Sequence, residues 1–263
     1  NRVFHAPASQ ERISHTHQMD LNKVDYEIQP LLPYQISRQG PSLATGDVTG
    51  NGLDDVFIGG SSGYGGTLFL QQKDGNFVES AYQPWKSDSL YADWGAHFFD
   101  ANGNGRLDLY VASGGYQLSP ASELLQDRLY INMGEGRFVR DAQALPNMLT
   151  STSAVVSGDF TGDNQPDLFV GGRLTPRNYP YPARSWILEN NGGEFQDVTN
   201  DVAPELAEPG GMITDAVWID FNGDKRLDLV TVGEWMPIQF FENDDNKHLQ
   251  HITSDVDLPP TRG

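Results

Sequence analysis

The sequence predicts an all-β fold, a β-propeller of four-stranded antiparallel blades with four repeats visible. Two observations carry this prediction: an Asp-rich loop between apolar runs occurs four times, and a hairpin pattern follows each copy. The leading aspartates are Asp47, Asp100, Asp159 and Asp220, at spacings of 53, 59 and 61 residues. Such a period fits one blade each, whereas the rungs of a β-solenoid are shorter.

Each repeat predicts four strands in a fixed order. Small residues precede the loop, as in 44–46 and 157–158, which suits a crowded inner strand. An apolar second strand follows the loop. The third and fourth strands form a hairpin, because apolar residues flank turn residues such as Asp74–Gly75 or Gly192–Gly193. No segment makes a convincing helix, and large aromatic residues are expected to fill the space between sheets: Phe57, Trp94, Tyr110, Phe169 and Trp218.

These repeats divide the chain. Residues 1–40 form a leader segment that could supply a closing or covering strand, and residues 41–263 carry the blades. The expected blade ranges are about 41–92, 93–150, 151–211 and 212–263. The chain begins without an initiator Met, so we expect a piece of a longer precursor, with other domains of that chain among its partners.

Composition narrows the function classes. The 263 residues include 36 Asp and Glu against 17 Lys and Arg, a formal charge of −19, which disfavours nucleic acid as a partner. No apolar stretch is long enough to span a bilayer, so direct membrane insertion is not expected. The absence of cysteine hints at an extracellular, periplasmic or cell-surface location without disulfides.

The Asp loops predict metal binding. Counted from the leading aspartate, positions 1, 3, 5 and 9 carry oxygen-bearing side chains, and position 7 would offer its backbone carbonyl. Hard oxygen ligands at alternate positions suit Ca²⁺, whereas Mg²⁺ demands stricter octahedral geometry. The side-chain candidates are Asp47, Thr49, Asn51, Asp55; Asp100, Asn102, Asn104, Asp108; Asp159, Thr161, Asp163, Asp167; and Asp220, Asn222, Asp224, Asp228. The position-7 candidates are Leu53, Arg106, Gln165 and Arg226.

Up to four structural calcium ions are therefore expected. The loops are not EF-hands, because position 12 is Ile58, Val111, Val170 or Thr231 inside a strand-like run. The ion would pin a β-turn whose carboxylates repel one another, and so contribute folding free energy. The alternative is a set of Asx turns without metal. Position 6 is Lys225 in the fourth loop, where a left-handed conformation is unfavourable, so this loop is either strained or differently turned.

The pattern D-x-[DNT]-x-[DN]-G-x-x-D followed by an apolar strand, as in Asp47–Gly60, resembles the FG-GAP/VCBS repeat of integrin α-type propellers. Leu31–Gly60 further resembles the bacterial branch related to cartilage acidic protein. The resemblance implies a seven-bladed extracellular propeller with calcium in its blade loops, acting in adhesion or recognition without established enzymatic activity. This chain shows only four copies, so it would be a fragment, a domain cut from a longer chain, or a smaller ring in which residues 24–36 supply a closing strand.

The sequence therefore favours a calcium-binding module that recognises a protein or glycan and is not an enzyme. The long inter-strand insertions 113–126 and 173–184 are expected to gather on one face that binds the partner. The second is rich in Pro, Tyr and Arg, which suits a recognition loop, because Tyr and Arg are enriched at binding hot spots. The alternative is a calcium-dependent carbohydrate-active enzyme, of the polysaccharide lyase or glycosidase type, since carboxylates such as Asp54, Asp215 and Glu234 are abundant. A third alternative is a purely structural spacer.

Overall fold

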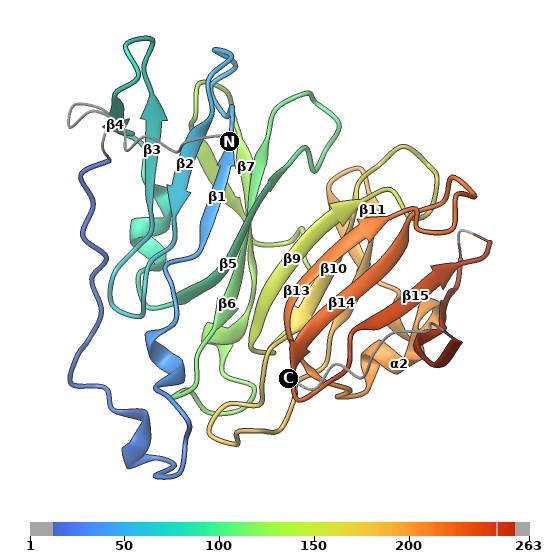
Figure 1. The fold of residues 1–263 in the computed structure, drawn as a ribbon. Coiled ribbons are helices and arrows are strands. Elements are labelled where there is room, and N and C mark those ends of the chain that lie inside the picture. Colours follow the sequence, from blue (N-terminus) through green and yellow to red (C-terminus); the bar gives the residue numbers. More distant parts are fainter. Residues whose placement is uncertain (1–12, 246, 256–263) are drawn as a thin grey trace, which may run out of the picture.

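The computed structural model describes residues 13–245 and 247–255. It contains four separate four-stranded antiparallel sheets, each formed by one continuous stretch of chain (Figure 1). The predicted all-β propeller built of four-stranded blades is confirmed. None of the helices in these residues is long and apolar enough to cross a membrane.

The strands of each sheet follow one another in space as they do in the chain. The first sheet contains β1 (Leu43–Gly46), β2 (Asp55–Ile58), β3 (Thr67–Gln71) and β4 (Phe77–Glu79). The second contains β5 (Ala92–Phe99), β6 (Asp108–Gly114), β7 (Arg128–Asn132) and β8 (Phe138–Asp141). The third contains β9 (Thr152–Gly158), β10 (Asp167–Gly172), β11 (Trp186–Asn191) and β12 (Glu194–Asp197). The fourth contains β13 (Met212–Ile219), β14 (Asp228–Glu234), β15 (Gln239–Asn243) and β16 (Leu249–His251).

The remaining elements of the described residues are short helical segments of three to five residues. Five are 3-10 turns: η1 (Asp25–Glu27), η2 (Ile36–Arg38), η3 (Pro84–Asp88), η4 (Glu123–Leu125) and η5 (Thr253–Asp255). Two are α-helical: α1 (Thr199–Val202) and α2 (Pro204–Ala207). The two α-helical turns correct the expectation of no helix. They form between the third and fourth sheets, where Asp197 accepts hydrogen bonds from Thr199 and Pro204 occupies the first turn of α2.

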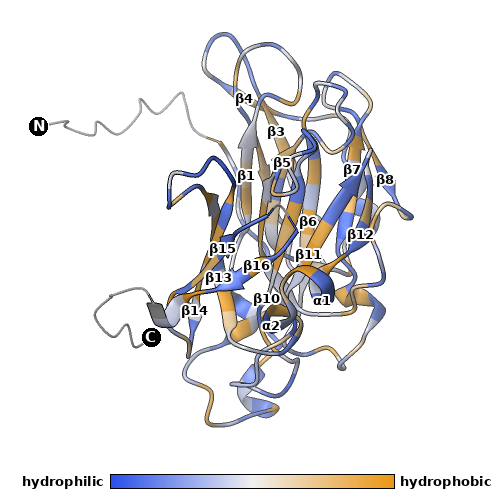
Figure 2. Cartoon of the chain, turned by 90° about the vertical axis from the view of Figure 1, so that its right-hand side faces the viewer, coloured by the Kyte–Doolittle hydropathy of each residue, from blue (hydrophilic) through white to orange (hydrophobic). Residues whose placement is uncertain are grey.

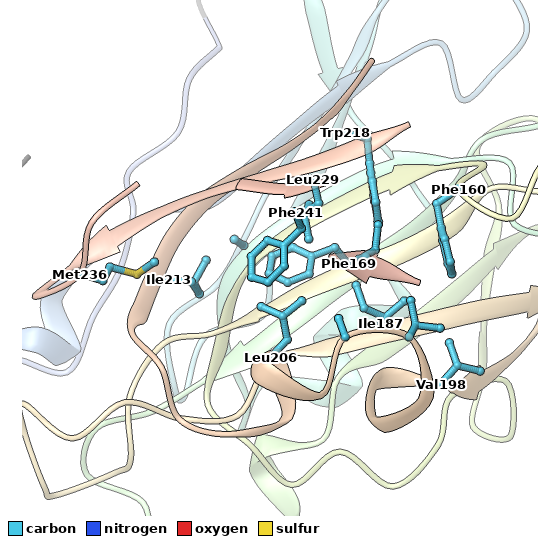
Figure 3. Close-up of a cluster of buried hydrophobic side chains, with 14 residues drawn as sticks. Phe160, Phe169, Ile187, Val198, Leu206, Ile213, Trp218, Leu229, Met236 and Phe241 are labelled. Atoms are coloured by element: carbon cyan, nitrogen blue, oxygen red, sulfur yellow. The ribbon is translucent and has the colours of Figure 1, made fainter. Parts of the chain in front are cut away.

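The sheets pack face to face through their inner strands, β1 on β5, β5 on β9 and β9 on β13. Apolar residues from neighbouring sheets fill each interface, and hydrophobic residues concentrate along the strands in Figure 2. Figure 3 shows the interface of the third and fourth sheets, where Phe160 stacks on Trp218 at a centroid distance of 5.5 Å beside Phe169. Of the predicted core aromatics, Trp94 differs, because it is partly buried and packs on the leader cluster instead of between sheets.

The arc formed by the sheets ends at the fourth sheet, whose outer face is partly exposed. Trp218 in β13 points into the interface with the third sheet, whereas its neighbours Val217 and Ile219 point the other way and are 49% and 46% exposed. The corresponding faces of the first three sheets are covered by the sheet that follows them.

The leader covers the first sheet without forming a strand in its described part, residues 13–40. In Figure 1 it runs outside β3 and β4 and reaches the lower end of the arc through η1 and η2. The ring of His15 contacts Phe69 of β3 edge-on, at a centroid distance of 5.9 Å. Leu32 and Ile36 are buried in a separate apolar cluster with Tyr116, Leu174, Tyr179 and Met212.

Candidate metal loops and recognition face

The four Asp loops occupy equivalent places in the four sheets. Each leading aspartate directly follows the inner strand, and each position-9 aspartate is the first residue of the second strand. The loop after β1 lies at the upper end of the first sheet in Figure 1, opposite the helical turns of the leader. The fold thus places the candidate residues of each predicted loop in one turn, and it keeps the four loops apart as separate sites.

The position-1 carboxylate organises the loop around itself. Asp47 Oδ1 accepts hydrogen bonds from the N–H groups of Gly50 and Asn51, and Oδ2 accepts one from Gly52 at 2.7 Å. Asp159 and Asp220 make the same three contacts in their loops. Burial raises the pKa of Asp47, but the backbone donors together outweigh burial and hold this pKa below its ordinary value.

The position-9 carboxylate ties the loop to the third strand of its sheet. Asp108 is fully buried, and it accepts hydrogen bonds from the N–H of Ala101 at 3.0 Å and of Asn132 at 2.7 Å. Asp55 and Asp228 are equally buried and make equivalent pairs of bonds. Asp167, also buried, accepts from the N–H of Asn190 in the third strand and from that of Thr161, one residue further along its loop. Burial raises the pKa of Asp108 and of Asp167 to about 6, despite these donors.

Position 6 adopts the left-handed conformation in every loop. Its φ angle is 82° at Gly52, 79° at Gly105, 67° at Asn164 and 73° at Lys225. The Lys225 loop is therefore turned like the others, and its N–H donates to Asp220 as the pattern requires. Glycine and asparagine tolerate this φ, whereas lysine does not, so the fourth loop is the strained one.

Positions 3 and 5 lie at the loop tips. The position-5 oxygen accepts a hydrogen bond from the N–H of position 7, as from Leu53 to Asn51 at 2.8 Å. In the second loop, Asn102 Oδ1 at position 3 is buried and has no hydrogen-bond partner. An unpartnered buried oxygen within a set of oxygen ligands fits a hard cation such as Ca²⁺.

The fourth loop fits a cation least well. The guanidinium of Arg226 at position 7 forms an ion pair with Asp224 at position 5, with 2.5 Å between Nη2 and Oδ2. This internal cation occupies a carboxylate that the sequence analysis assigned to calcium. In the described residues, neither the third nor the fourth loop brings its three carboxylates within 4.8 Å of one another as a group. The carboxylates of Asp244 and Asp245 and the imidazole of His248 do lie that close, on the exposed hairpin of the fourth sheet.

Side-chain amides also join neighbouring sheets, a contact that the repeat pattern did not predict. At the end of the third strand, Asn132 Nδ2 donates to the carbonyl of Val48 in the preceding loop and to Leu107 in its own loop. Asn190 and Asn243 repeat this arrangement at the next two interfaces. A signal was present in the sequence, because an asparagine stands five or six residues before the terminal apolar residue of the last three hairpins.

The two long insertions gather at the leader end of the arc, as expected. The N–H of Arg177 donates to the carbonyl of Tyr116 at 3.0 Å, and its guanidinium donates to the carbonyl of Gln117. From the leader, Gln29 accepts a hydrogen bond from the Tyr116 hydroxyl and donates to the carbonyl of Tyr179 at 2.7 Å. We call this surface, formed by the leader 24–38 and loops 113–126 and 173–184, the recognition face.

A charged and aromatic cluster extends the recognition face to the fourth sheet. Arg173 forms an ion pair with Glu234, at 2.7 Å, and the Tyr34 hydroxyl of the leader also donates to Glu234. Beside this pair, Trp235 is 67% exposed and donates its indole N–H to Tyr179 at 2.8 Å. The leader therefore joins loops of the second, third and fourth sheets.

The sequence model of the FG-GAP-like repeat family matches residues 47–111, from the first Asp loop through the second. The chain is also similar to "Cartilage acidic protein 1" of Xenopus tropicalis, with 26% identity over 77% of this chain, and of Homo sapiens, with 25% identity over 73%. It spans 30% and 28% of the length of these two relatives. The predicted resemblance to FG-GAP/VCBS repeats and to cartilage acidic protein is confirmed.

Proposed function

We propose that this chain, an FG-GAP-like repeat protein related to cartilage acidic protein 1, is a calcium-stabilised recognition module that binds a protein or glycan through its recognition face. The observation that carries the proposal is the assembly of that face from three separate parts of the chain, with Gln29 bonded to Tyr116 and to Tyr179. A rigid scaffold that presents clustered loops is a common way to build a binding surface.

The chemistry of the recognition face supports binding. Trp235 and Tyr181 are 67% and 62% exposed, and the hydrogen bond from Trp235 to Tyr179 restricts the indole. Exposed aromatic residues held in place lose little conformational entropy when they bind a partner. The backbone of Trp235 has a φ of 61°, an unfavourable conformation that often marks functional sites.

Calcium would act as a structural ion in the Asp loops. The residues that would hold it are those at positions 1, 3, 5 and 9 of each loop, with the carbonyl at position 7. The ion would supply positive charge against the clustered carboxylates. The unpartnered oxygen of Asn102 makes the second loop the best candidate, and the Arg226–Asp224 ion pair makes the fourth the poorest.

The proposal places the chain outside the cell and assigns it no catalysis. Zero cysteines and the strong acidic charge fit a secreted protein, and the relatives are by name acidic proteins of cartilage. The exposed Val217 and Ile219 would pack against a further part of a longer protein, because equivalent faces in this arc are covered by a neighbouring sheet.

Two experiments test the proposal. The first is thermal unfolding of the chelated protein with and without millimolar Ca²⁺, with Mg²⁺ as the control. One site saturated at about 100 times its dissociation constant adds roughly 2.7 kcal/mol, so a calcium-selective rise in Tm is expected. If Ca²⁺ does not raise the Tm of a metal-free sample, the loops are metal-independent Asx turns.

The second experiment screens the chain against protein and glycan arrays. We expect a saturable ligand whose binding is weakened by Trp235→Ala and is unchanged by Met133→Ala, an exposed residue on the hairpin of the second sheet. A ligand that binds both variants equally well would show that the recognition face is not its binding site. The absence of any saturable ligand would favour a structural spacer.

A further inference from the structure

A pocket lies between the leader and the first two sheets. It is bounded by leader residues on one side, by loop 61–62 on another, and by the start of β5 and the loop after β6. We call it the leader pocket. The residues that carry the argument are Asp20, Lys23, Arg38, Ser62, Trp94 and Leu118.

Two adjacent glycines shape the apolar wall of the leader pocket. A Cβ added at Gly114 would come within 1.9 Å of the ring of Trp94, and one at Gly115 would come within 2.6 Å of the Leu118 side chain. Both side chains therefore lie directly against the backbone. The indole and Leu118, together with Leu90, give the pocket a broad apolar surface.

The polar rim contains both donors and acceptors with hydrogen-bonding capacity left. Lys23 Nζ donates to Ser62 Oγ at 3.0 Å, and Arg38 Nη2 donates to the carbonyl of Leu21 at 3.2 Å. Asp20 Oδ1 accepts from the N–H of Asn22. An ammonium has three donors, a guanidinium five, and a carboxylate about four acceptor sites, so each group can take a further partner.

The charges around the leader pocket balance. Lys23 and Arg38 are opposed by Asp20 on the rim and by buried Asp25 behind it, which accepts hydrogen bonds from Ser37 and Gln117 of the pocket lining. None of Asp20, Lys23, Asp25 and Arg38 forms an ion pair within the described residues. A neutral ligand whose groups both donate and accept suits such a rim better than an anion or a cation does.

A neutral sugar matches both the apolar wall and the polar rim of the leader pocket. One face of a pyranose ring presents C–H groups, which can lie on an indole, while its hydroxyls donate and accept at the ring edge. We propose that the leader pocket binds one neutral pyranose unit of a glycan, with the C–H face of the sugar on Trp94. This inference rests on the proposed recognition function and names its ligand class and subsite.

The test uses the whole chain and methyl glycosides of glucose, galactose, mannose and N-acetylglucosamine at millimolar concentrations, with glucuronate as the charged comparison. Binding is followed by saturation-transfer NMR and tryptophan fluorescence. We expect at least one neutral glycoside to bind more tightly than glucuronate. Trp94→Leu should weaken that binding at least about tenfold, equivalent to about 1.4 kcal/mol.

The matched control is Tyr82→Leu, which removes an exposed aromatic ring that lines neither the leader pocket nor the recognition face, and it should change affinity less than about twofold. If Trp94→Leu fails to fold, Asp20→Asn and Ser62→Ala at the rim replace it and should also weaken binding. Failure of every neutral glycoside to bind, or equal binding by wild type and the pocket variants, would overturn the inference. If a ligand found on the arrays binds the pocket variants normally, the leader pocket is not its binding site, whereas the proposed recognition function still holds.

Discussion

The side chain of Asn190 donates one hydrogen bond to the carbonyl of Ala101, in the Asp loop of the preceding sheet, and another to Pro166 in its own sheet, at 2.9 and 3.0 Å. Its backbone N–H donates to the buried carboxylate of Asp167. One residue therefore connects two Asp loops and the third strand. The Asp loops consequently stabilise the contact between sheets, in addition to turning the chain within a sheet.

Asn190→Ala tests this connection. Asn190 is buried, and its loss leaves two carbonyls and the N–H of Gly193 without a partner. We expect the free energy of unfolding to fall by about 2 to 4 kcal/mol, measured by urea denaturation. The neighbouring exposed Asn191→Ala is the control and should stay within about 0.5 kcal/mol of wild type. Equal effects of the two variants would contradict the role of the side-chain amide.

The strained Lys225 backbone gives a second prediction. Lys225→Gly should stabilise the chain by about 1 kcal/mol, because glycine accommodates a φ of 73° without the Cβ contact. Lys225→Ala removes the same charge but keeps the Cβ, so it should give no such gain. If Lys225→Ala stabilised the chain as much as Lys225→Gly, charge would be the cause instead of backbone strain.

Asp127 predicts a pH dependence of stability. It is buried and accepts hydrogen bonds from the Ser113 N–H and the Tyr110 and Thr152 hydroxyls, and burial raises its pKa to about 7. Because the folded-state pKa lies above the ordinary pKa of an aspartate, about 3.8, the contribution to stability is complete below about pH 4 and is lost as the pH rises through about 7.

The measurement compares wild type with Asp127→Asn, which cannot titrate. Between about pH 4 and 7 the stability of wild type should fall relative to that of the variant, by at most about 1.4 kcal/mol per pH unit. Other titrating carboxyl groups are common to both proteins and cancel in the difference. Parallel pH profiles would show that Asp127 is ionised throughout this range.

The open face of the fourth sheet gives a fourth prediction. Val217→Thr combined with Ile219→Thr should change the free energy of unfolding of this chain by less than about 1 kcal/mol, because both side chains are about half exposed. Leu229→Ala, on the covered face of the same sheet, should cost about 2 to 5 kcal/mol. A large loss in the double variant would mean that the outer face is covered in solution.

The sequence determined the repeat and, through it, the blade. Local spacing was sufficient because the Asp loop, the apolar second strand and the hairpin turn each have a short-range physical cause: oxygen capping of backbone N–H groups, alternating burial and positive-φ turn residues. The left-handed conformation of Lys225 also follows from its place in the repeat, although lysine by itself does not favour it.

The tertiary structure alone decided what joins the blades and what the leader does. The bond from Asn190 to Ala101 links residues 89 positions apart, and the bond from Gln29 to Tyr179 links residues 150 apart, so no local pattern encodes either partner. The leader pocket forms where the leader lies against the second sheet, at the irregular β5–β6 pairing that places Trp94 on Gly114. Such contacts depend on the relative placement of whole sheets, which buried surface and packing determine.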